Sequence, residues 1–141
     1  PKDDWDGLKR VYKNSKIPVA ADESASSKEE VWNLIKNKTV QVINIKLMKT
    51  GLSESLAIAS IARASGLKLM IGGLVESYLS MTCAAHLAAG FGGFDFVDLD
   101  TPLFLSSNPT RGMRITSGGL YDLSKIRSGI GVIPSPSNFR S

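Results

Sequence analysis

The feature that most constrains this sequence is a regular alternation of short, β-branched apolar segments with longer segments of helical period. The apolar segments end at polar or glycine residues, which are Asp22, Lys46, Gly73 and Asp98. The steps between successive ends are nearly equal in length. Each step has room for one strand, one helix and their connections, so the repeat predicts βαβ units and a parallel sheet.

We predict strands over residues 17–21, 40–45, 67–71 and 94–97, with a helix following each of the first three strands. Asp3-Asp4 and Ser27 have the form of helix caps, and Ser53 is the predicted start of the helix that follows the second strand. Four such units are half of the eight that a TIM barrel needs. They also suffice for an open doubly wound sheet, so the repeat alone leaves both α/β architectures open.

Composition removes several classes of function. Hydrophobic residues make up 43% and charged residues 21% of the 141 residues, which is ordinary for a soluble globular protein. The net charge of +4 is spread along the chain without a basic run, which argues against nucleic-acid binding. No apolar stretch has the length that a membrane-spanning helix needs, so we expect no membrane span. The single cysteine, Cys83, fits a reducing compartment and favours the cytoplasm; because Pro1 is not methionine, we expect the true N-terminus to lie upstream.

In parallel α/β folds the active site lies at the carboxyl ends of the strands, where two charged residues stand in this sequence. Asp22 has a carboxylate that could bind Mg²⁺, or it could cap the next helix. Lys46 could act as a general base if burial and nearby positive charge lower its pKa. It could equally extend to solvent from a strand end.

The other two strand ends also have two interpretations each. Gly73, in a Gly-Gly pair, could let a ligand approach closely, or it could form a tight turn. Asp98 and Asp100 would point to one face of a strand and would suit an ammonium group or a metal, unless they form a loop that faces water. Cys83 and His86 share a helix face but are too few for a zinc site.

Together these segments resemble a known family. Pro18–Ser24 and Asn44–Gly51 resemble the ends of the fifth and sixth barrel strands in the mandelate racemase/muconate lactonizing enzyme family of the enolase superfamily. Gly72-Gly73 and Val75–Ser77 are similar to the seventh strand end. Asp98–Pro102 resembles the eighth-strand motif of L-Ala-D/L-Glu dipeptide epimerases. The four motifs occur in the family's order.

The resemblance implies the C-terminal half of a TIM-type barrel, with strands five to eight and their helices in residues 1–105. After Pro102 the helical period disappears and Gly, Ser and Pro dominate, so we predict an irregular tail with room for one hairpin in residues 106–141. It implies that Asp22 binds Mg²⁺ and that Lys46 moves the proton next to a substrate carboxylate. Asp98 and Asp100 would hold the α-ammonium group of a dipeptide, and Gly73 would leave room for it. A half barrel exposes strand edges, so we also expect a homo-oligomer.

The sequence departs from the family pattern in ways that keep alternatives open. Of three acidic metal ligands on consecutive strands only Asp22 is present, and the second catalytic lysine and the N-terminal capping domain are absent. N-acylamino-acid racemase, o-succinylbenzoate synthase and cycloisomerase reactions are alternatives within the same family. The pair of Asp98 and Asp100 argues against them, because their substrates lack a free α-ammonium group. A different alternative is an inactive truncated product with only an interaction role.

Overall fold

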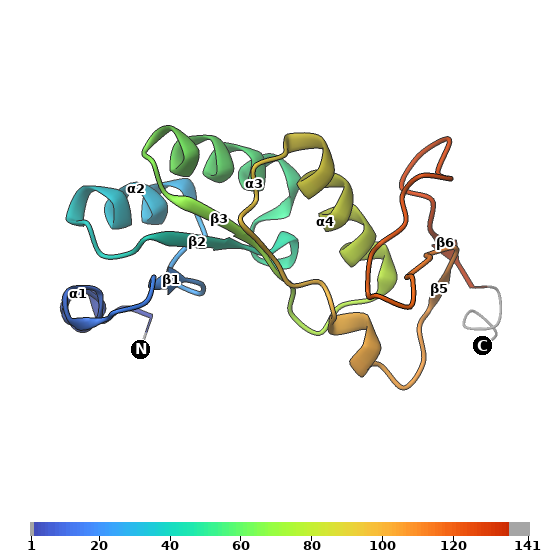
Figure 1. Cartoon of the computed structure of the whole chain (residues 1–141), viewed down its shortest axis with the longest axis horizontal. Coiled ribbons are helices and arrows are strands. Elements are labelled where there is room, and N and C mark those ends of the chain that lie inside the picture. The colour runs from blue at the N-terminus through green and yellow to red at the C-terminus, as the bar shows by residue number, and fades with distance from the viewer. Residues whose placement is uncertain (1, 136–141) are drawn as a thin grey trace. The chain divides into compact units, whose positions relative to one another are not determined.

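The computed structural model describes residues 2–135 (Figure 1). Pro1 and residues 136–141, which include the end of the predicted tail, lie outside the described residues. The chain divides into two compact units. The first comprises residues 1–72 and 93–98, and the second comprises residues 73–92 and 99–141. The predicted division at residue 105 remains a prediction.

The first unit contains the whole parallel sheet. Its elements are α1 (Trp5–Asn14), β1 (Ala20–Ala21), α2 (Lys28–Asn37), β2 (Val42–Ile45), α3 (Leu47–Ala64), β3 (Lys68–Ile71) and β4 (Phe96–Val97). The strands are parallel and lie in the order β1-β2-β3-β4, which is their order along the chain. A doubly wound sheet reverses its strand order at a switch point. The sequential order therefore favours the barrel architecture over the doubly wound one.

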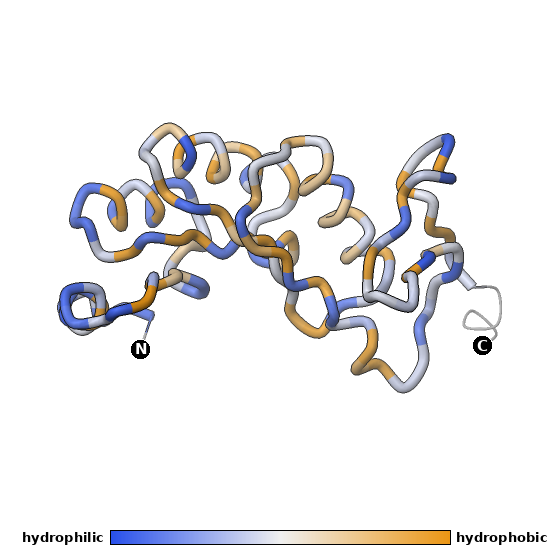
Figure 2. The backbone as a smooth tube through the Cα atoms, viewed as in Figure 1, coloured by the Kyte–Doolittle hydropathy of each residue, from blue (hydrophilic) through white to orange (hydrophobic). Residues whose placement is uncertain are grey.

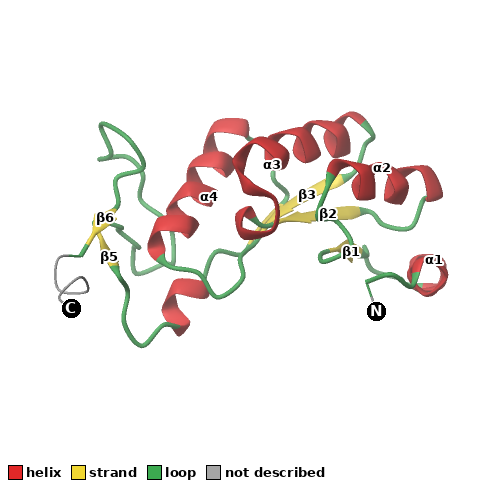
Figure 3. Cartoon of the chain, turned by 180° about the vertical axis from the view of Figure 1, so that it is seen from behind, coloured by secondary structure: helices red, strands yellow, loops and turns green. Residues whose placement is uncertain are grey.

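The core of this unit lies between the sheet and the helices α2 and α3, which lie on the same side of β2 and β3 (Figure 3). One face of these strands is formed by Ile43, Ile45, Leu69 and Ile71, each at most 1% exposed. Full burial of such a side chain stabilises a fold by about 1.5–3 kcal/mol. The apolar character of β2 and β3 is visible along the backbone in Figure 2. On the opposite face, the Lys68 ammonium lies 5.8 Å from the centre of the Phe96 ring.

Two of the predicted helix caps are present. Asp4 precedes α1 and its Oδ1 accepts a hydrogen bond of 2.7 Å from the Gly7 amide. Ser27 precedes α2 and its hydroxyl accepts from the Glu30 amide at 3.1 Å, while the Glu30 carboxylate accepts from the Ser26 amide. These contacts satisfy amide groups that have no partner within the helix.

Several predicted boundaries were wrong. The second strand begins at Val42 instead of Val40. The first strand begins at Ala20 instead of Ile17, because Pro18 has no N–H to donate and Ile17 is 74% exposed. The fourth strand is limited to residues 96–97. The helix predicted from Ser53 begins earlier, at Leu47, with a break at Gly51, where φ is 69°. Glycine tolerates this left-handed conformation, which lets a short helical turn precede the long one.

The second unit contains α4 (Tyr78–Phe91), the 3₁₀ helix η1 (Thr101–Phe104), β5 (Thr110–Arg111) and β6 (Ile133–Pro134). The two short strands pair antiparallel, and an isolated bridge joins Ile115 to Tyr121 within the segment between them. None of the helices in the described residues is long and apolar enough to cross a membrane.

Candidate active site

Asp22 and Lys46 are brought together by neighbouring strands. Asp22 directly follows β1, Lys46 directly follows β2, and these strands pair with Ala21 opposite Ile43. Lys46 Nζ lies 2.7 Å from Oδ2 of Asp22 and 3.7 Å from Oε1 of Glu23. The Lys46 side chain is only 11% exposed, so the interpretation that it simply extends into solvent was wrong.

The Asp22 carboxylate is held in its ionised form. Partial burial works to raise the pKa of Asp22, but the hydrogen bonds and positive charges of Lys46 and Lys49 outweigh it and hold the pKa below its usual value. Asp22 does not cap the following helix, because Ser27 caps α2. A fixed, ionised carboxylate at a strand end is suited to bind a cation.

The pKa of Lys46 moves in the direction opposite to the one expected from the sequence. Burial works to lower it, but the hydrogen bond and charge of Asp22, with a further contribution from Glu23, outweigh burial and raise it. The prediction of a lowered pKa considered burial and positive neighbours and did not include an anion 2.7 Å from Nζ. In this arrangement Lys46 is an ammonium paired with Asp22.

Two further residues that the sequence interpretation left without a role surround the same carboxylate. Lys49 Nζ lies 2.7 Å from Oδ1 of Asp22, and Asn44 Nδ2 donates to Oδ2 at 3.2 Å. Asn44 stands two positions before Lys46 in one extended segment and so shares its side of the sheet. Lys49 follows shortly after Lys46, in the first turn of α3. The spacing of Asn44, Lys46 and Lys49 is the signal that could have identified them.

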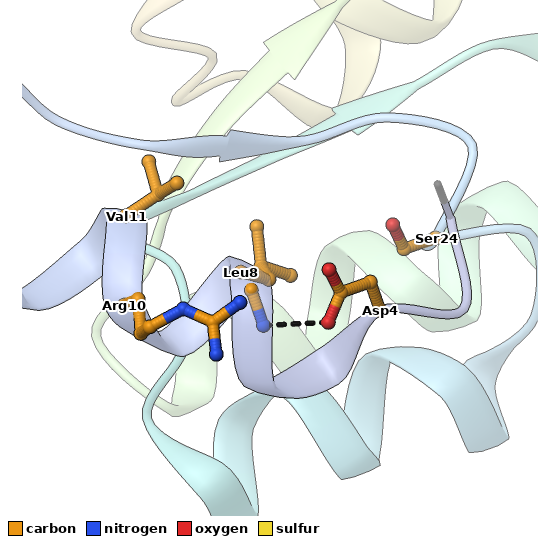
Figure 4. Close-up of a pocket in the computed structure, with 6 residues that line it drawn as sticks. Asp4, Leu8, Arg10, Val11 and Ser24 are labelled. Atoms are coloured by element: carbon orange, nitrogen blue, oxygen red, sulfur yellow. Dashed lines mark hydrogen bonds between the residues drawn. The ribbon is translucent and has the colours of Figure 1, made fainter.

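An open hollow of about 440 Å³ adjoins Asp22 and is also lined by Lys2, Leu8, Glu23 and Ser24. A second hollow shares Leu8 and Ser24 with it and is lined by polar groups of the α1 start, as Figure 4 shows. In that view Asp4 is turned toward the Gly7 amide in its capping contact. The Asp22 carboxylate is therefore reachable from solvent on the side of α1.

The two glycines after β3 make close contacts. A Cβ atom on Gly72 would lie 2.9 Å from Oδ1 of Asn44, within the first unit. A Cβ atom on Gly73 would lie 2.7 Å from Sδ of Met81 and 3.2 Å from Oγ1 of Thr101, within the second unit. Close packing therefore favours glycine at position 72, and it does so less strictly at position 73, where the nearest atoms end the flexible Met81 side chain. The role of Gly73 in admitting a substrate remains a prediction.

Asp98 and Asp100 are both exposed and flank the buried Leu99. The Asp98 amide continues the sheet by donating to the Ile71 carbonyl at 2.9 Å. In the second unit, the Tyr121 hydroxyl donates to the Leu99 carbonyl at 2.5 Å. The pKa of Tyr121 is raised to about 12. Burial is the largest cause, and the nearby Tyr78 and Asp100 add smaller contributions. The structure brings together Asp22 and Lys46; the role of Asp98 and Asp100 in holding an ammonium group remains a prediction.

The carboxylate of Asp22 offers oxygen atoms as ligands. These suit Mg²⁺, a hard cation that takes oxygen ligands and is usually bound through one or two carboxylates. Residues 2–135 contain no group of three or more His, Cys, Asp or Glu side chains that could hold a metal ion. This part of the chain therefore offers Mg²⁺ one oriented carboxylate. His86, considered as a metal ligand, lies with Nε2 3.3 Å from the Ile130 carbonyl instead.

Parallel βα units in sequential order, with an acid and a lysine at adjoining strand ends, are typical of a barrel-type α/β domain. Residues 1–137 match the sequence profile described as Enolase C-terminal domain-like. The chain belongs to this family, and its βα units form the C-terminal half of a TIM-type barrel. The fold and the family predicted from the sequence are therefore confirmed.

The relatives of this chain include dipeptide epimerases. It is 51% identical over 126 residues to the aromatic dipeptide epimerase of Herpetosiphon aurantiacus, covering 89% of this chain and 35% of that protein. It is 50% identical over 117 residues to the L-Ala-D/L-Glu epimerase of Thermotoga maritima, covering 83% of this chain and 34% of that protein. The similarity supports an epimerase-like function in this family.

A solved structure extends the comparison to a bound state. The chain matches the dipeptide epimerase of Enterococcus faecalis V583, complexed with Mg and L-Leu-L-Tyr, with a TM-score of 0.85 and 35% identity. The match covers 94% of this chain and 38% of that one. This chain thus spans little more than a third of the length of each of these proteins.

Proposed function

We propose that this chain supplies the C-terminal half of the barrel of a magnesium-dependent dipeptide epimerase. The observation that carries the proposal is the contact of Lys46 Nζ with Asp22 Oδ2, at 2.7 Å, at the carboxyl ends of adjacent parallel strands. The names of the relatives support a dipeptide as the substrate class, and the Enterococcus faecalis structure, which contains Mg and a dipeptide, supports Mg²⁺ as the metal. Each of the three relatives described above is named as a dipeptide epimerase or an L-Ala-D/L-Glu epimerase, so we prefer this reaction to N-acylamino-acid racemase, o-succinylbenzoate synthase and cycloisomerase reactions.

The proposed reaction inverts the carbon next to the dipeptide carboxylate. Lys46 works from one face of that carbon as base or acid. In the ammonium form that Asp22 favours, Lys46 is the acid. To act as the base it must first lose a proton, and the neutral amine then takes the proton from the carbon while the electron pair of the C–H bond moves into the carboxylate. A second acid on the opposite face returns a proton to the carbon and completes the inversion. Mg²⁺ held by Asp22 would stabilise the negative charge that develops on the substrate carboxylate. Asp98 and Asp100 would hold the α-ammonium group, with Gly73 beside it.

We assign this chain half a site because the proposed reaction uses one of its lysines, Lys46, and one of its carboxylates, Asp22, as acid or base and as metal ligand. Mg²⁺ and a second acid both need side chains beyond Asp22 and Lys46. A hybrid protein, in which this chain replaces its matched segment in the Herpetosiphon aurantiacus relative, would supply them from the rest of that relative, since the match covers 35% of its length. We use the term hybrid enzyme for this protein below.

The hybrid enzyme tests the proposal directly. Incubated with Mg²⁺ and an L,L-dipeptide in deuterated water, it should invert the C-terminal residue and incorporate deuterium at the inverted carbon. An N-acylated amino acid serves as the matched control, because it lacks the free α-ammonium group. Turnover of the acylated substrate in preference to the dipeptide would favour a racemase, and a folded hybrid without either activity would favour the inactive product.

A further inference from the structure

Lys49 is a buried lysine with no assigned role in the proposed reaction. It lies in the first turn of α3, and its side chain is only 8% exposed. Burial of an ammonium group away from water is costly unless the charge is paired and its donors are used. The position of Lys49 therefore depends on the groups that surround Nζ.

Three oxygens surround Nζ of Lys49, one for each ammonium hydrogen. They are the backbone oxygen of Asp22 at 2.6 Å, Oδ1 of Asp22 at 2.7 Å and the backbone oxygen of Asn44 at 3.2 Å. Two of the acceptors are main-chain atoms at the ends of β1 and β2. Lys49 therefore joins the two strand ends and, with its third hydrogen, fixes one carboxylate oxygen of Asp22.

Lys46 contacts the same carboxylate in a different way. Its Nζ lies near two side-chain carboxylates, Asp22 at 2.7 Å and Glu23 at 3.7 Å. These contacts can be exchanged without moving the backbone. Lys49 Nζ, by contrast, binds two main-chain oxygens in addition to the carboxylate, so Lys49 is the lysine of this pair that is anchored to the strand ends.

We propose that Lys49 is a positioning residue that orients the Asp22 carboxylate for a metal ion, with Asn44 supporting the second oxygen. The metal part of this inference rests on the proposed function. Hydrogen bonds to a carboxylate ligand fix its orientation, and loss of such a partner typically lowers metal affinity by about 10–100-fold. A lysine that served only to join the strands would affect stability and leave metal affinity unchanged.

The first experiment tests the geometry without any metal. In ¹H–¹⁵N spectra of the ammonium groups of the whole chain, Lys49 should give a slowly exchanging signal, because three oxygens shield its hydrogens. The signal should vanish in Lys49→Met and persist in Lys16→Met, the control variant, whose lysine is exposed in the loop after α1. Absence of any protected ammonium signal that depends on Lys49 would overturn the proposal, whatever the protein binds.

The second experiment tests the effect on the metal. Calorimetric titration of the hybrid enzyme with Mg²⁺ alone, without substrate, should show affinity about 10–100-fold lower for Lys49→Met. Lys49→Arg keeps the charge and should recover part of this loss, while Lys16→Met should bind as the parent does. Equal affinity in folded Lys49→Met and parent would sink the proposal. If the parent hybrid enzyme binds no Mg²⁺, the proposed function is wrong, and the ¹H–¹⁵N ammonium spectra are then the test of whether Lys49 holds the Asp22 carboxylate. If Lys49→Met does not fold, the Mg²⁺ affinity of Lys49→Arg and the ammonium signals of the parent chain test the proposal in its place.

Discussion

Asn44 and Gly72 face each other at the ends of β2 and β3: a Cβ atom on Gly72 would lie 2.9 Å from Oδ1 of Asn44 and 3.2 Å from its Nδ2. Asn44 is 6% exposed and its Nδ2 donates to Asp22. The absence of a side chain at Gly72 thus leaves room for the amide that contacts the Asp22 carboxylate.

Gly72→Ala should therefore lower the free energy of unfolding by about 1–3 kcal/mol, the usual cost of forcing an extra group into a packed site. Gly90→Ala is the matched control. A Cβ atom on Gly90 would meet nothing within 4 Å, and α4 should gain about 0.5–1 kcal/mol from the change. Urea unfolding followed by circular dichroism measures both values. Equal stability of the two variants would contradict the close contact.

Lys46→Ala should abolish epimerisation by the hybrid enzyme. General-base catalysis contributes about 10²–10⁴-fold to a rate, so kcat should fall by at least that range. The fold should persist, because Lys49 still pairs with Asp22 after the change. Polarimetry or NMR measures the turnover, and circular dichroism checks the fold. Near-normal turnover would make Lys46 a structural lysine and would assign the base elsewhere.

The chain by itself, without the rest of a barrel, should not epimerise a dipeptide. A single carboxylate, that of Asp22, should hold Mg²⁺ poorly, and Lys46 has no second acid opposite it. Incubation with L-Ala-L-Glu and Mg²⁺ in deuterated water is the measurement. Inversion at the glutamate would refute the expectation, whereas exchange of the α-proton without inversion would mean that Lys46 still works from its own face.

The isolated chain should form a dimer or a larger assembly. β1 and β4 are the edges of the sheet, and on β4 both Phe96 (42%) and Val97 (61%) are exposed. Open apolar edges are templates for pairing with another chain. Light scattering after size-exclusion chromatography should show a mass above 15.1 kDa, and Val97→Lys should reduce the assembly. A sharp peak of the parent chain at the monomer mass, with cooperative unfolding, would contradict this.

Alkaline stability should depend on Tyr121. Its pKa is raised to about 12 in the folded chain, against about 10 for an unfolded tyrosine. The neutral side chain thus favours the folded state: its contribution is complete below about pH 10 and is lost as pH rises through about 12. The tyrosinate absorbance of the folded chain should include a step near pH 12 that is absent from Tyr121→Phe and present in Tyr12→Phe. A step that persists in Tyr121→Phe would assign the raised pKa to another residue.

The strands and the main site pair were predictable because their signals are local. β-branched runs ending in Asp22 and Lys46 indicated two strand ends, and the rule that active sites lie at such ends brought the two side chains to one edge. The order of the strands was not predictable from the repeat, because it depends on pairing between distant segments. The resemblance to a family resolved what the repeat left open.

The role of Lys49 and the direction of the pKa shift of Lys46 could not be read from the sequence. Both depend on distances to Asp22, which stands one whole βα unit earlier in the chain. Lys49 reaches Asp22 because α3 starts at Leu47, and that early turn depends on the left-handed backbone of Gly51. A helix starting at Ser53, as predicted, would have left Lys49 in a loop without a fixed direction.

The contact of Tyr121 with the Leu99 carbonyl has a consequence for how sequences of this kind can diverge. The hydroxyl binds the main chain, so it restrains the backbone at position 99 whatever side chain stands there. Mutations at Tyr121 can thus alter the backbone just before Asp100, within the second unit, while leaving the residues of that segment unchanged. Under the proposed role of Asp100 in holding the substrate, specificity can therefore change through a substitution in the segment after the 3₁₀ helix, and a survey restricted to strand ends would overlook it.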